Sequence, residues 1–490
     1  MSNGKLLVVS NRLPITVEKV GDSFKVHASS GGLVTALDSV LRKHGGIWMG
    51  WAGSETNEEL AKVIEQASLQ HPYRLEAVPL SDEDITNFYL GFSNEIVWPL
   101  FHDLQSRCNF NPEYWSSYCA VNQRFASLAA QSAKPGDFIW IHDYHFTLVA
   151  KYLRDRHLSN EIGFFQHIPF PPPDIFEKLP WRKQILEGML SHDIVGFQTD
   201  RDRKNFQACV RALLPNARVA DDHTTYLSRR SRVAVFPISV DFHEFAEIAA
   251  QPAVEQHTAR IKEEQSGRQI VLGVDRLDYT KGIVERLLAF RHLLKHESQL
   301  HRRITLVQIV VPSRADIPKY REMKEEVERL VSEINGKYSD AGWIPILYFY
   351  RSLPREELVA YYRAADIALV TPIKDGMNLV AKEYCAAQVD HNGVLILSEF
   401  AGAAVELNCG AIMVNPNDQE AVASALVTAA RMPLGERKQR MQGLRNALRD
   451  NDVYDWAELF LEAGQETRVE KRHPFGAETG GMFRSVAGIV

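Results

Sequence analysis

The fold class is decided by residues 270–282, which read IVLGVDRLDYTKG. Residues 270–274 form a continuous apolar run, which is typical of a strand that is buried on both faces of a parallel sheet. The polar residues that follow lead into a helical pattern that begins near Ile283. A strand, a short loop and a helix in this order form the repeating unit of an open α/β sheet. The stretch therefore predicts a doubly wound α/β domain.

Apolar runs of the same kind recur along the chain, with longer helical patterns between them. One such pattern places Met323, Val327, Leu330, Val331 and Ile334 on a single helix face. The strand pattern restarts after residue 240, which predicts two Rossmann-like domains with doubly wound parallel sheets. The predicted strands comprise residues 6–9, 138–141, 162–165, 194–197, 233–238, 270–274, 304–311, 346–348, 367–370, 394–397 and 411–414.

The length of 490 residues agrees with two large domains, because single hydrophobic cores stop growing beyond about 250 to 300 residues. We predict that the first domain comprises residues 1–240 and the second comprises residues 241–465. In this prediction the last helix of the second domain can cross back to the first domain. Residues 466–490 lack periodicity and carry glycine and charge, so they are predicted to be a tail. A binding cleft is expected between the two domains.

The composition excludes several classes of protein. Apolar residues make up 45% of the chain and charged residues 24%, which excludes a disordered or low-complexity protein. The formal charge of −6, with no basic tail, excludes a dedicated nucleic-acid binder. No apolar stretch approaches the ~20 residues that span a bilayer. The five cysteines include no CxxC pair that would indicate zinc or a disulfide framework. We expect a soluble, cytoplasmic protein without nucleic-acid or membrane partners.

Three common motifs of α/β enzymes are missing from the sequence. The absence of GxGxxG and GxxxxGK(S/T) argues against a dehydrogenase or a nucleoside triphosphatase, and the nucleophile elbow GxSxG is also absent. The tripeptide Asp200-Arg201-Asp202 matches the DxD pattern by which some sugar-nucleotide enzymes hold a metal. Because it opens a helical pattern, capping of that helix by Thr199 or Asp200 is the simpler interpretation.

Polar side chains follow two neighbouring strands of the first predicted sheet. His142, Asp143 and His145 come at the end of one strand, and His167 follows the next. Because the ligands of an open α/β sheet bind beyond the carboxyl ends of its strands, these residues predict a binding site. Two alternatives stay open. The two histidines that are three residues apart could ligate a metal, or each histidine could be a satisfied residue near a strand end.

Two cations lie on the loop after the first strand of the second domain. Arg276 and Lys281 are expected to lie at the carboxyl end of this strand and to face the cleft between the domains. Two fixed cations at this position suit a diphosphate. The alternative is a solvated loop of salt bridges.

Residues 371–383, which read TPIKDGMNLVAKE, again run from a strand into a helix. The pair Asp375-Gly376 makes the turn, and the backbone N–H groups and positive helix end that follow can hold an anion without a metal. Glu383 lies one turn past Leu379 on the same helix face, where its carboxylate can accept hydrogen bonds from two ribose hydroxyls. The alternative for Glu383 is a first-turn acid that complements the helix dipole.

Taken together, these motifs resemble those of the trehalose-6-phosphate synthases, which are retaining glycosyltransferases of the two-domain class called GT-B. The resemblance covers residues 5–465 in order, and matches of this length are highly specific. It implies two Rossmann-like domains that face a cleft. The matching motifs include VVSNRLP at 8–14, SGGL at 30–33, WMGW at 48–51, WIHDYH at 140–145, GFFQHIPFP at 163–171, VDRLDYTKG at 274–282 and DGMNLVAKEY at 375–384.

The resemblance implies that the second domain binds a nucleoside-diphosphate glucose, normally UDP-glucose. Arg276 and Lys281 would bind the diphosphate, and Glu383 would bind the ribose. The backbone at Leu353 would contact the uracil, and His167 would contact the transferred glucose. The remaining donor contacts would come from a first-domain loop with Gly31 and Gly32 and from the segment that holds the phosphates and glucose hydroxyls, namely Asp375, Gly376, Met377, Asn378, Leu379 and Val380.

The resemblance also implies that the first domain binds glucose 6-phosphate as the acceptor. Arg12 and Arg314 would hold its phosphate together with Tyr89. Asp143 would bond its sugar hydroxyls, and Trp98 would help to select its anomer. The cations on both domains would offset the repulsion between two phosphorylated sugars.

The implied reaction transfers glucose with retention and gives α,α-trehalose 6-phosphate. Retention by double displacement needs a carboxylate beneath the anomeric carbon, yet Asp143 and Glu383 already have other roles. We therefore adopt front-face attack, in which a departing phosphate oxygen takes the proton of the acceptor. The catalytic candidates are Arg276, Lys281, His167 and Asp143, and neither a metal nor a cofactor is expected.

Two other functions fit parts of the sequence. A glucosylglycerol-phosphate synthase would keep the donor site and accept glycerol 3-phosphate. A catalytically silent paralogue that binds a sugar phosphate would be expected to lose Arg276, Lys281 or Glu383, and all three are present. No phosphatase motif DxDx(T/V) follows residue 465, so a separate phosphatase is expected to act on the product. The resemblance also implies a homodimer or a homotetramer.

Overall fold

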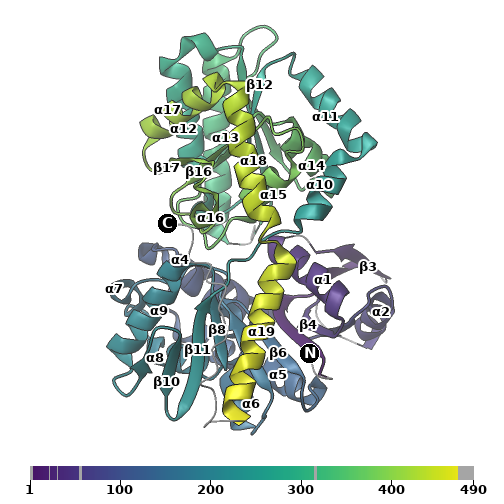
Figure 1. Ribbon diagram of the computed structural model, residues 1–490, viewed down its shortest axis with the longest axis vertical. Coiled ribbons are helices and arrows are strands. Elements are labelled where there is room, and N and C mark those ends of the chain that lie inside the picture. Colours follow the sequence, from purple (N-terminus) through teal and green to yellow (C-terminus); the bar gives the residue numbers. More distant parts are fainter. Residues whose placement is uncertain (1–3, 21–22, 30, 54–57, 314–316, 473–490) are drawn as a thin grey trace. The chain divides into compact units, whose positions relative to one another are not determined.

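The computed structural model describes residues 4–20, 23–29, 31–53, 58–313 and 317–472. The chain divides into two units (Figure 1). Each unit contains its own α/β sheet, and most strand pairs are parallel. The predicted fold class of two doubly wound α/β domains is thereby confirmed. The first unit comprises Met1–Ile238 together with Val453–Val490, and the second comprises Ser239–Asp452.

The sheet of the second unit is parallel throughout the residues that the structure describes. Its strand order is β14-β13-β12-β15-β16-β17, which in chain order within the unit is 3-2-1-4-5-6, the order of a dinucleotide-binding Rossmann sheet. The winding reverses between β12 and β15, and sheets of this kind bind their ligands at this switch point. The strands are β12 (Gln269–Arg276), β13 (Ile304–Val311), β14 (Ile346–Tyr350), β15 (Ile367–Val370), β16 (Val394–Ser398) and β17 (Ile412–Val414).

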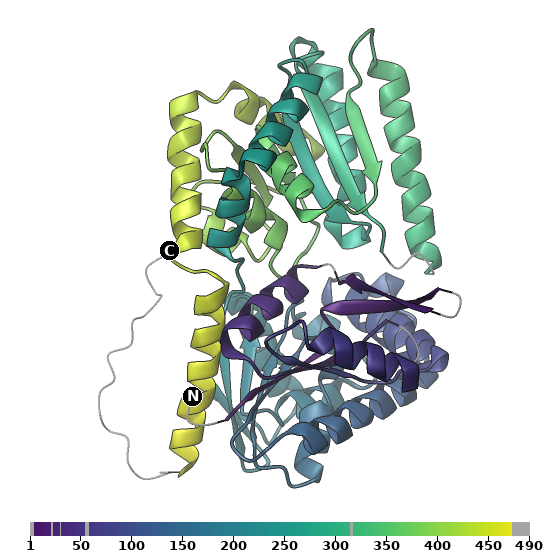
Figure 2. The same ribbon diagram turned by 90° about the vertical axis from the view of Figure 1, so that its right-hand side faces the viewer.

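The strand sequences agree with a sheet that is covered on both faces. β13 reads ITLVQIVV, and all of its residues except the last are buried. Apolar residues therefore run continuously instead of alternating. Figure 2 shows α13 (green) and α18 (yellow) at opposite sides of this unit. Its helices are α10 (Phe242–Ala250), α11 (Pro252–Glu264), α12 (Ile283–His296), α13 (Pro318–Tyr338), α14 (Arg355–Ala364), α15 (Leu379–Ala387), α16 (Ala404–Leu407), α17 (Gln419–Arg431) and α18 (Leu434–Arg449), with 3₁₀ turns η4 (Tyr279–Lys281) and η5 (Ser298–Leu300).

The sheet of the first unit is wound in the same way. Its described strands have the order β5-β4-β1-β6-β7-β8-β11-β10-β9. The strands from β5 to β11 are parallel to one another, and β10 pairs antiparallel with both β11 and β9. A second switch point lies between β1 and β6. The strands are β1 (Leu6–Arg12), β4 (Ile47–Trp51), β5 (Arg74–Ala77), β6 (Phe138–His142), β7 (Glu161–Phe165), β8 (Ile194–Phe197), β9 (Arg218–Val219), β10 (His223–Tyr226) and β11 (Arg229–Val235), and β2 (Ile15–Val20) and β3 (Ser23–Ala28) form a separate hairpin.

Helix α19 (Val453–Arg472) returns the chain to the first unit, where it packs along β7 and β8 (Figures 1 and 2). Its Phe460 ring lies above two strand glycines, because a Cβ added at Gly163 or Gly196 would be 2.7 or 2.8 Å from this ring. Glycine at these strand positions therefore makes room for the helix. Residues 466–472, which the sequence predicts as the start of a tail, belong to this helix.

One helix of the first unit is unusually wide. In η1 (Ile85–Val97) the hydrogen bonds run five residues back, as in the bond from the Trp98 N–H group to the Ser93 carbonyl oxygen. Such π-helices are rare and are frequent at functional sites. The other helices of this unit are α1 (Gly32–His44), α2 (Glu58–Ser68), α3 (Asp82–Asp84), α4 (Trp98–Phe101), η2 (Gln105–Arg107), α5 (Pro112–Ser132), η3 (Tyr144–Phe146), α6 (Val149–Asp155), α7 (Pro173–Phe176), α8 (Arg182–Met189) and α9 (Asp200–Leu213).

Nowhere in the described residues of the chain does a helix combine the length and the apolar composition that a bilayer span requires.

Candidate active site

The two predicted diphosphate-binding cations lie at the end of β12 and in the loop between β12 and α12. Arg276 is the last residue of β12 and is exposed. Lys281 is the last residue of the short turn η4. Asp278 shapes this turn, because its carboxylate accepts hydrogen bonds from the Thr280 N–H group and hydroxyl group at 3.0 and 2.9 Å. The turn places Lys281 on the β12 side of the switch point.

Gly282 lets this loop pack against the end of β15. Its φ of 65° lies in the left-handed region, and a Cβ at this position would lie 2.2 Å from the Thr371 carbonyl oxygen. Only glycine meets both conditions. The Thr280 carbonyl oxygen also accepts a hydrogen bond from the Ile373 N–H group at 2.8 Å. The loops that follow β12 and β15 are therefore joined.

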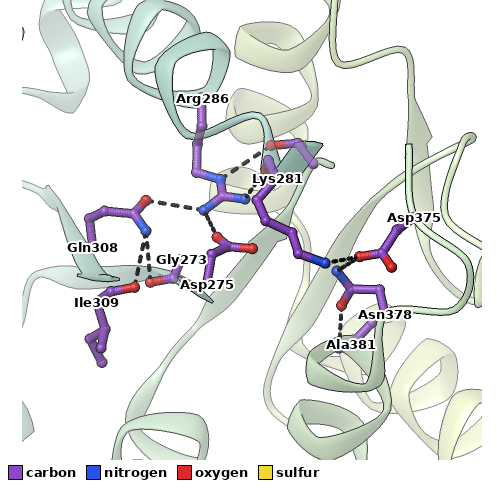
Figure 3. A network of polar contacts seen from close by, with 10 residues as sticks. Gly273, Asp275, Lys281, Arg286, Gln308, Ile309, Asp375, Asn378 and Ala381 are labelled. Carbon is purple, nitrogen blue, oxygen red and sulfur yellow. Dashed lines mark hydrogen bonds and ion pairs between the residues drawn. The ribbon is translucent and has the colours of Figure 1, made fainter. Parts of the chain in front are cut away.

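Lys281 reaches the loop that follows β15 (Figure 3). Its Nζ lies 2.6 Å from Oδ2 of Asp375, and the two side chains are only 14% and 13% exposed. The Asn378 amide donates to the same carboxylate oxygen at 3.1 Å. Asn378 also caps α15, because its Oδ1 accepts a hydrogen bond from the Ala381 N–H group at 3.2 Å. A continuous path of polar contacts leads from Lys281 to the start of α15.

The segment before α15 is held by its backbone. Asp375 forms an isolated bridge with Ala401, and the Met377 carbonyl oxygen accepts a hydrogen bond from the Ala403 N–H group at 2.8 Å. The positive end of α15 lies beside this segment, and such an end suits an anion. Of the predicted donor residues here, Gly376, Met377 and Asn378 are buried, and Asp375, Leu379 and Val380 are half-buried.

A buried arginine beneath the loop was not predicted. Arg286, near the start of α12, has a fully buried side chain and forms an ion pair with Asp275 of β12. It also donates to Gln308 Oε1 at 3.1 Å and to Thr371 Oγ1 at 3.2 Å. One guanidinium thus joins β12, β13 and the residue after β15 (Figure 3). Burial raises the pKa of Asp275, and the charge of Arg286 opposes this effect.

Glu383 is the fifth residue of α15, so the first-turn alternative for this acid is wrong. Its carboxylate accepts a hydrogen bond from the Tyr362 hydroxyl group at 2.7 Å. Burial raises the pKa of Glu383, whereas the Tyr362 hydrogen bond and the charge of Arg355 lower it. Leu353, the predicted uracil contact, is half-buried in the loop between β14 and α14. Because β13 separates β14 from β12, Leu353 follows a strand that is farther from the switch point.

Arg12 ends β1 on one side of the switch point in the first unit. Its guanidinium lies 4.7 Å from the ring centroid of Trp51 and 5.5 Å from that of Tyr89. Such cation–π contacts are favourable and restrict the plane of the guanidinium. The backbone is held as well, because the Trp48 indole donates to the Ser10 hydroxyl at 2.8 Å, and this hydroxyl donates to the Arg12 carbonyl oxygen at 2.7 Å.

Tyr89 and Trp98 are brought close to the residues that follow β6. The Tyr89 ring, in η1, stacks on His145 at a centroid distance of 6.1 Å. Trp98 follows η1 and is buried, with its ring 5.9 Å from Tyr144 and 4.4 Å from His102. Tyr89 and Trp98 therefore both contact the turn η3, which follows β6.

Asp143 and His167 meet at the ends of β6 and β7. Oδ1 of Asp143 accepts a hydrogen bond from the His167 N–H group at 3.2 Å, and the Asp143 N–H group donates to the Phe165 carbonyl oxygen at 2.8 Å. Asp143 has a φ of 73°. Such backbone strain in a residue other than glycine costs on the order of 1–3 kcal/mol and is typical of functional sites.

His142 and His167 form a hydrogen-bonded pair, with Nδ1 of His142 3.0 Å from Nε2 of His167. Burial lowers the pKa of His167 to about 3. Burial, followed by the charge of His167, lowers the pKa of His142 well below its usual value. Both rings are therefore neutral at pH 7. Among the described residues, no group of three or more His, Cys, Asp or Glu side chains is arranged to bind a metal.

Comparison with known proteins identifies the family of this chain. The family model described as "Glycosyltransferase family 20" matches residues 4–466. The chain belongs to glycosyltransferase family 20. The match covers both units and includes all of the predicted site residues.

Relatives of this family 20 chain are named as synthases of trehalose 6-phosphate. The "Trehalose-6-phosphate synthase" of Mycolicibacterium smegmatis is 43% identical over 472 residues, which cover 93% of this chain and 92% of that protein. The "Bifunctional trehalose-6-phosphate synthase/phosphatase" of Thermoproteus tenax is 40% identical over 468 residues, which cover 93% of this chain and 63% of that protein. The chain therefore spans less than two thirds of the bifunctional relative.

Solved structures of similar proteins agree with this family. An α,α-trehalose-phosphate synthase (UDP-forming) from Burkholderia xenovorans, in complex with glucose-6-phosphate, has a TM-score of 0.86 and 35% identity over 94% of this chain and 100% of that chain. An E. coli structure bound with UDP-2-fluoro glucose has a TM-score of 0.85 and 36% identity over 94% of this chain and 99% of that chain. The predicted family and the GT-B fold class are confirmed, and the chain is a glycosyltransferase.

In this family 20 enzyme, the predicted donor loop of the first unit depends on glycine. Gly31 has a φ of 134° and precedes Gly32, the first residue of α1. A Cβ added at Gly31 would meet no described atom within 4 Å, so glycine is needed for the backbone conformation and not for space. Arg314, the second arginine predicted to bind the acceptor phosphate, lies outside the described residues.

The DxD tripeptide of the glycosyltransferase serves the start of a helix. Thr199 is the N-cap of α9, and its Oγ1 accepts a hydrogen bond from the Asp202 N–H group at 3.2 Å. The Asp202 carboxylate accepts a hydrogen bond from the Phe170 N–H group at 2.9 Å. Asp200 forms an ion pair with Lys204 in the next turn. The capping interpretation is confirmed.

Proposed function

We propose that the protein transfers glucose from UDP-glucose to glucose 6-phosphate with retention and forms α,α-trehalose 6-phosphate. This proposal rests on the ion pair between Lys281 and Asp375, which lies in the loop before α15 at the β12–β15 switch point. A sheet of this winding binds a nucleotide at its switch point. The similar Burkholderia xenovorans structure holds glucose-6-phosphate, and the similar E. coli structure holds a UDP-glucose analogue. Both substrate classes are thus bound by close relatives in fold and sequence.

The donor diphosphate would replace Asp375 as the partner of Lys281. The Lys281 ammonium is paired with this carboxylate in the structure, and a diphosphate carries more negative charge and more acceptor oxygens than one carboxylate. Release of Asp375 would leave its carboxylate available to the hydroxyls of the glucose. Arg276 at the end of β12 and the N-terminus of α15 supply further positive groups.

The acceptor phosphate would bind at Arg12, whose guanidinium is oriented by the rings of Trp51 and Tyr89. Arginine suits this role because its planar fork can donate two parallel hydrogen bonds to a phosphate. Asp143 would accept hydrogen bonds from the sugar hydroxyls, and Trp98 would form an apolar wall that selects the anomer. His167 would contact the transferred glucose as a neutral ring.

The reaction that we propose is a front-face displacement. The bond from the anomeric carbon to the diphosphate oxygen breaks, and its electron pair stays on UDP. The acceptor hydroxyl oxygen bonds to the same face of the anomeric carbon, and its proton passes to the departing phosphate oxygen. Lys281, Arg276 and the start of α15 stabilise the charge that develops on the diphosphate. Positive groups of this kind each contribute about 10²–10³ to turnover.

No metal and no cofactor are part of this proposal, because fixed cations and a helix end would stabilise the leaving group. A homodimer or homotetramer, and a separate phosphatase that acts on the product, complete the proposal. Glycerol 3-phosphate is the competing acceptor, since Arg12 would hold the phosphate of either molecule.

The test measures nucleoside diphosphate release from the glucose esters of UDP, GDP and ADP, each with glucose 6-phosphate or glycerol 3-phosphate. We expect the highest rate with UDP-glucose and glucose 6-phosphate, an α,α-linked product by NMR, and full activity after treatment with EDTA. A β-linked product would refute retention. A preference for glycerol 3-phosphate would refute the acceptor assignment, and reversible loss of activity with EDTA would refute the metal-free mechanism.

A further inference from the structure

The carboxylate of Glu383 is held by a single tyrosine. Tyr362 of α14 is fully buried, with 1% of its surface exposed, and its hydroxyl group donates to Oε2 of Glu383 at 2.7 Å. Within the described residues this is the one hydrogen bond that the structure gives to the Glu383 carboxylate. Oε1 is therefore left to accept hydrogen bonds from a ligand.

Arg355, whose charge lowers the pKa of Glu383, does not form a direct ion pair with it. Arg355, also on α14, instead pairs with Glu244, with 2.6 Å between Nη2 and Oε2, and its guanidinium packs on the Phe245 ring at 4.8 Å. Where a carboxylate is shielded from water, one hydrogen bond and no ion pair leave it with too few hydrogen-bond donors. Vicinal hydroxyl groups of a sugar can supply the missing donors.

We propose that Tyr362 is the positioning residue for ribose recognition. Its hydroxyl fixes the orientation of the Glu383 carboxylate, so that Oε1 faces the 2′- and 3′-hydroxyl groups of the nucleotide. A free glutamate side chain loses rotamer freedom when it binds a ligand. A carboxylate that is already oriented avoids this loss, which raises affinity and selectivity for ribose. The inference rests on the proposed function, in which Glu383 binds the ribose of the donor.

The neighbouring residue in the sequence provides a matched control. Tyr384 is also fully buried, but its hydroxyl group lies 3.3 Å from the carbonyl oxygen of Ala365 and 3.4 Å from that of Val394. Tyr384→Phe and Tyr362→Phe both remove one buried hydroxyl group from the same unit. Only Tyr362→Phe frees the Glu383 carboxylate.

The experiment measures by calorimetry the Kd of UDP and of 2′-deoxy-UDP for the full-length protein and three variants, Tyr362→Phe, Tyr384→Phe and Glu383→Gln. We expect the unchanged protein to bind UDP with a Kd about tenfold lower than that of 2′-deoxy-UDP, because one hydrogen bond to a charged group contributes about this much affinity. Tyr362→Phe should weaken UDP binding by about tenfold and 2′-deoxy-UDP binding by less than about threefold. Tyr384→Phe should keep the preference of the unchanged protein.

Steady-state kinetics give a second readout. Because the ribose is remote from the bond that breaks, Tyr362→Phe should raise the KM for the donor by about tenfold and leave kcat within about twofold. A purely structural role for Tyr362 would instead lower kcat and raise the Kd of both nucleotides together.

Two outcomes separate this inference from the function on which it rests. If Glu383→Gln leaves both nucleotide affinities unchanged, Glu383 does not bind ribose and that part of the proposed function is wrong. If Glu383→Gln abolishes the preference for UDP while Tyr362→Phe retains it, the proposed function stands and the positioning role of Tyr362 is wrong. Equal weakening of UDP and 2′-deoxy-UDP by Tyr362→Phe also overturns that role.

Discussion

Replacement of Arg286 by methionine should destabilise the second unit strongly. The side chains of Arg286 and Asp275 are 0% and 2% exposed, so the variant would leave a carboxylate buried without its cation. Removal of one partner of a buried ion pair costs about 3–5 kcal/mol. The second unit has 214 residues, from 239 to 452, and a domain of this size loses roughly 2–4 °C in melting temperature per kcal/mol. The expected decrease is therefore about 6–20 °C.

The loss of stability in Arg286→Met should also depend on pH, and the direction of this dependence follows from the pKa of Asp275. Burial raises the pKa of Asp275, and Arg286 opposes that effect, so the pKa in the folded variant rises further above the value in the unfolded chain. The folded variant then binds a proton that the unfolded chain lacks. Its stability is greatest below the unfolded pKa and falls as the pH rises through the folded pKa. We expect a larger loss at pH 8 than at pH 5.

Differential scanning calorimetry at the two pH values measures both effects. Arg445→Met is the matched control, because Arg445 is a buried arginine of the same unit whose guanidinium donates to the carbonyl oxygens of Cys385 and Ala386. Replacement of Arg445 leaves no buried carboxylate without a cation. The free energy of unfolding should therefore decrease by about 1–3 kcal/mol, and by the same amount at both pH values. A decrease below about 1 kcal/mol for Arg286→Met, or an equal decrease at both pH values, would refute this reasoning.

Three further predictions concern catalysis and packing. Lys281→Ala should lower UDP release about 10²–10³-fold at saturating glucose 6-phosphate, and an effect on KM alone would contradict its role at the leaving group. Asp143→Ala should raise the KM for glucose 6-phosphate and leave slow hydrolysis of UDP-glucose unchanged, so equal loss of both activities would contradict its assignment to the acceptor. Phe460→Ala should lower the free energy of unfolding of the first unit by about 3–5 kcal/mol, as measured by thermal unfolding, because the Phe460 ring lies above Gly163 and Gly196. The control is Leu459→Ala, which changes a half-exposed position of the same helix.

The buried strands of both sheets could be predicted because their apolar residues run without interruption. β13 and β8 lie where the sequence pattern placed them. β4 was missed, since IWMGW is short and interrupted by glycine, and a pattern of strand propensity is weak over five residues. The hairpin of β2 and β3 was not predicted because its residues alternate in polarity, as in strands with one exposed face, and do not form the continuous apolar run that marks the buried strands.

The candidate site was predictable where single loops carry several polar residues. Lys281, Asp375 and Asn378 follow two strands that the pattern located, and the strand order brings them together. Arg286 and Tyr362 were not predicted, because each lies inside a helix whose sequence shows an ordinary mixture of polar and apolar residues. Their partners lie on other elements, so only the folded chain reveals the contact.

The path of the chain has a consequence for biosynthesis. The first unit ends its first segment at Ile238 and receives α19 only after the 214 residues of the second unit have been translated. At the usual 5–20 residues per second, a ribosome needs roughly 10–40 s for this interval. During that time Phe460 does not yet cover Gly163 and Gly196, so the apolar surface around these glycines on the nascent first unit is accessible to chaperones. The second unit, by contrast, is continuous in the sequence and can finish folding while the ribosome is still adding the residues that complete the first.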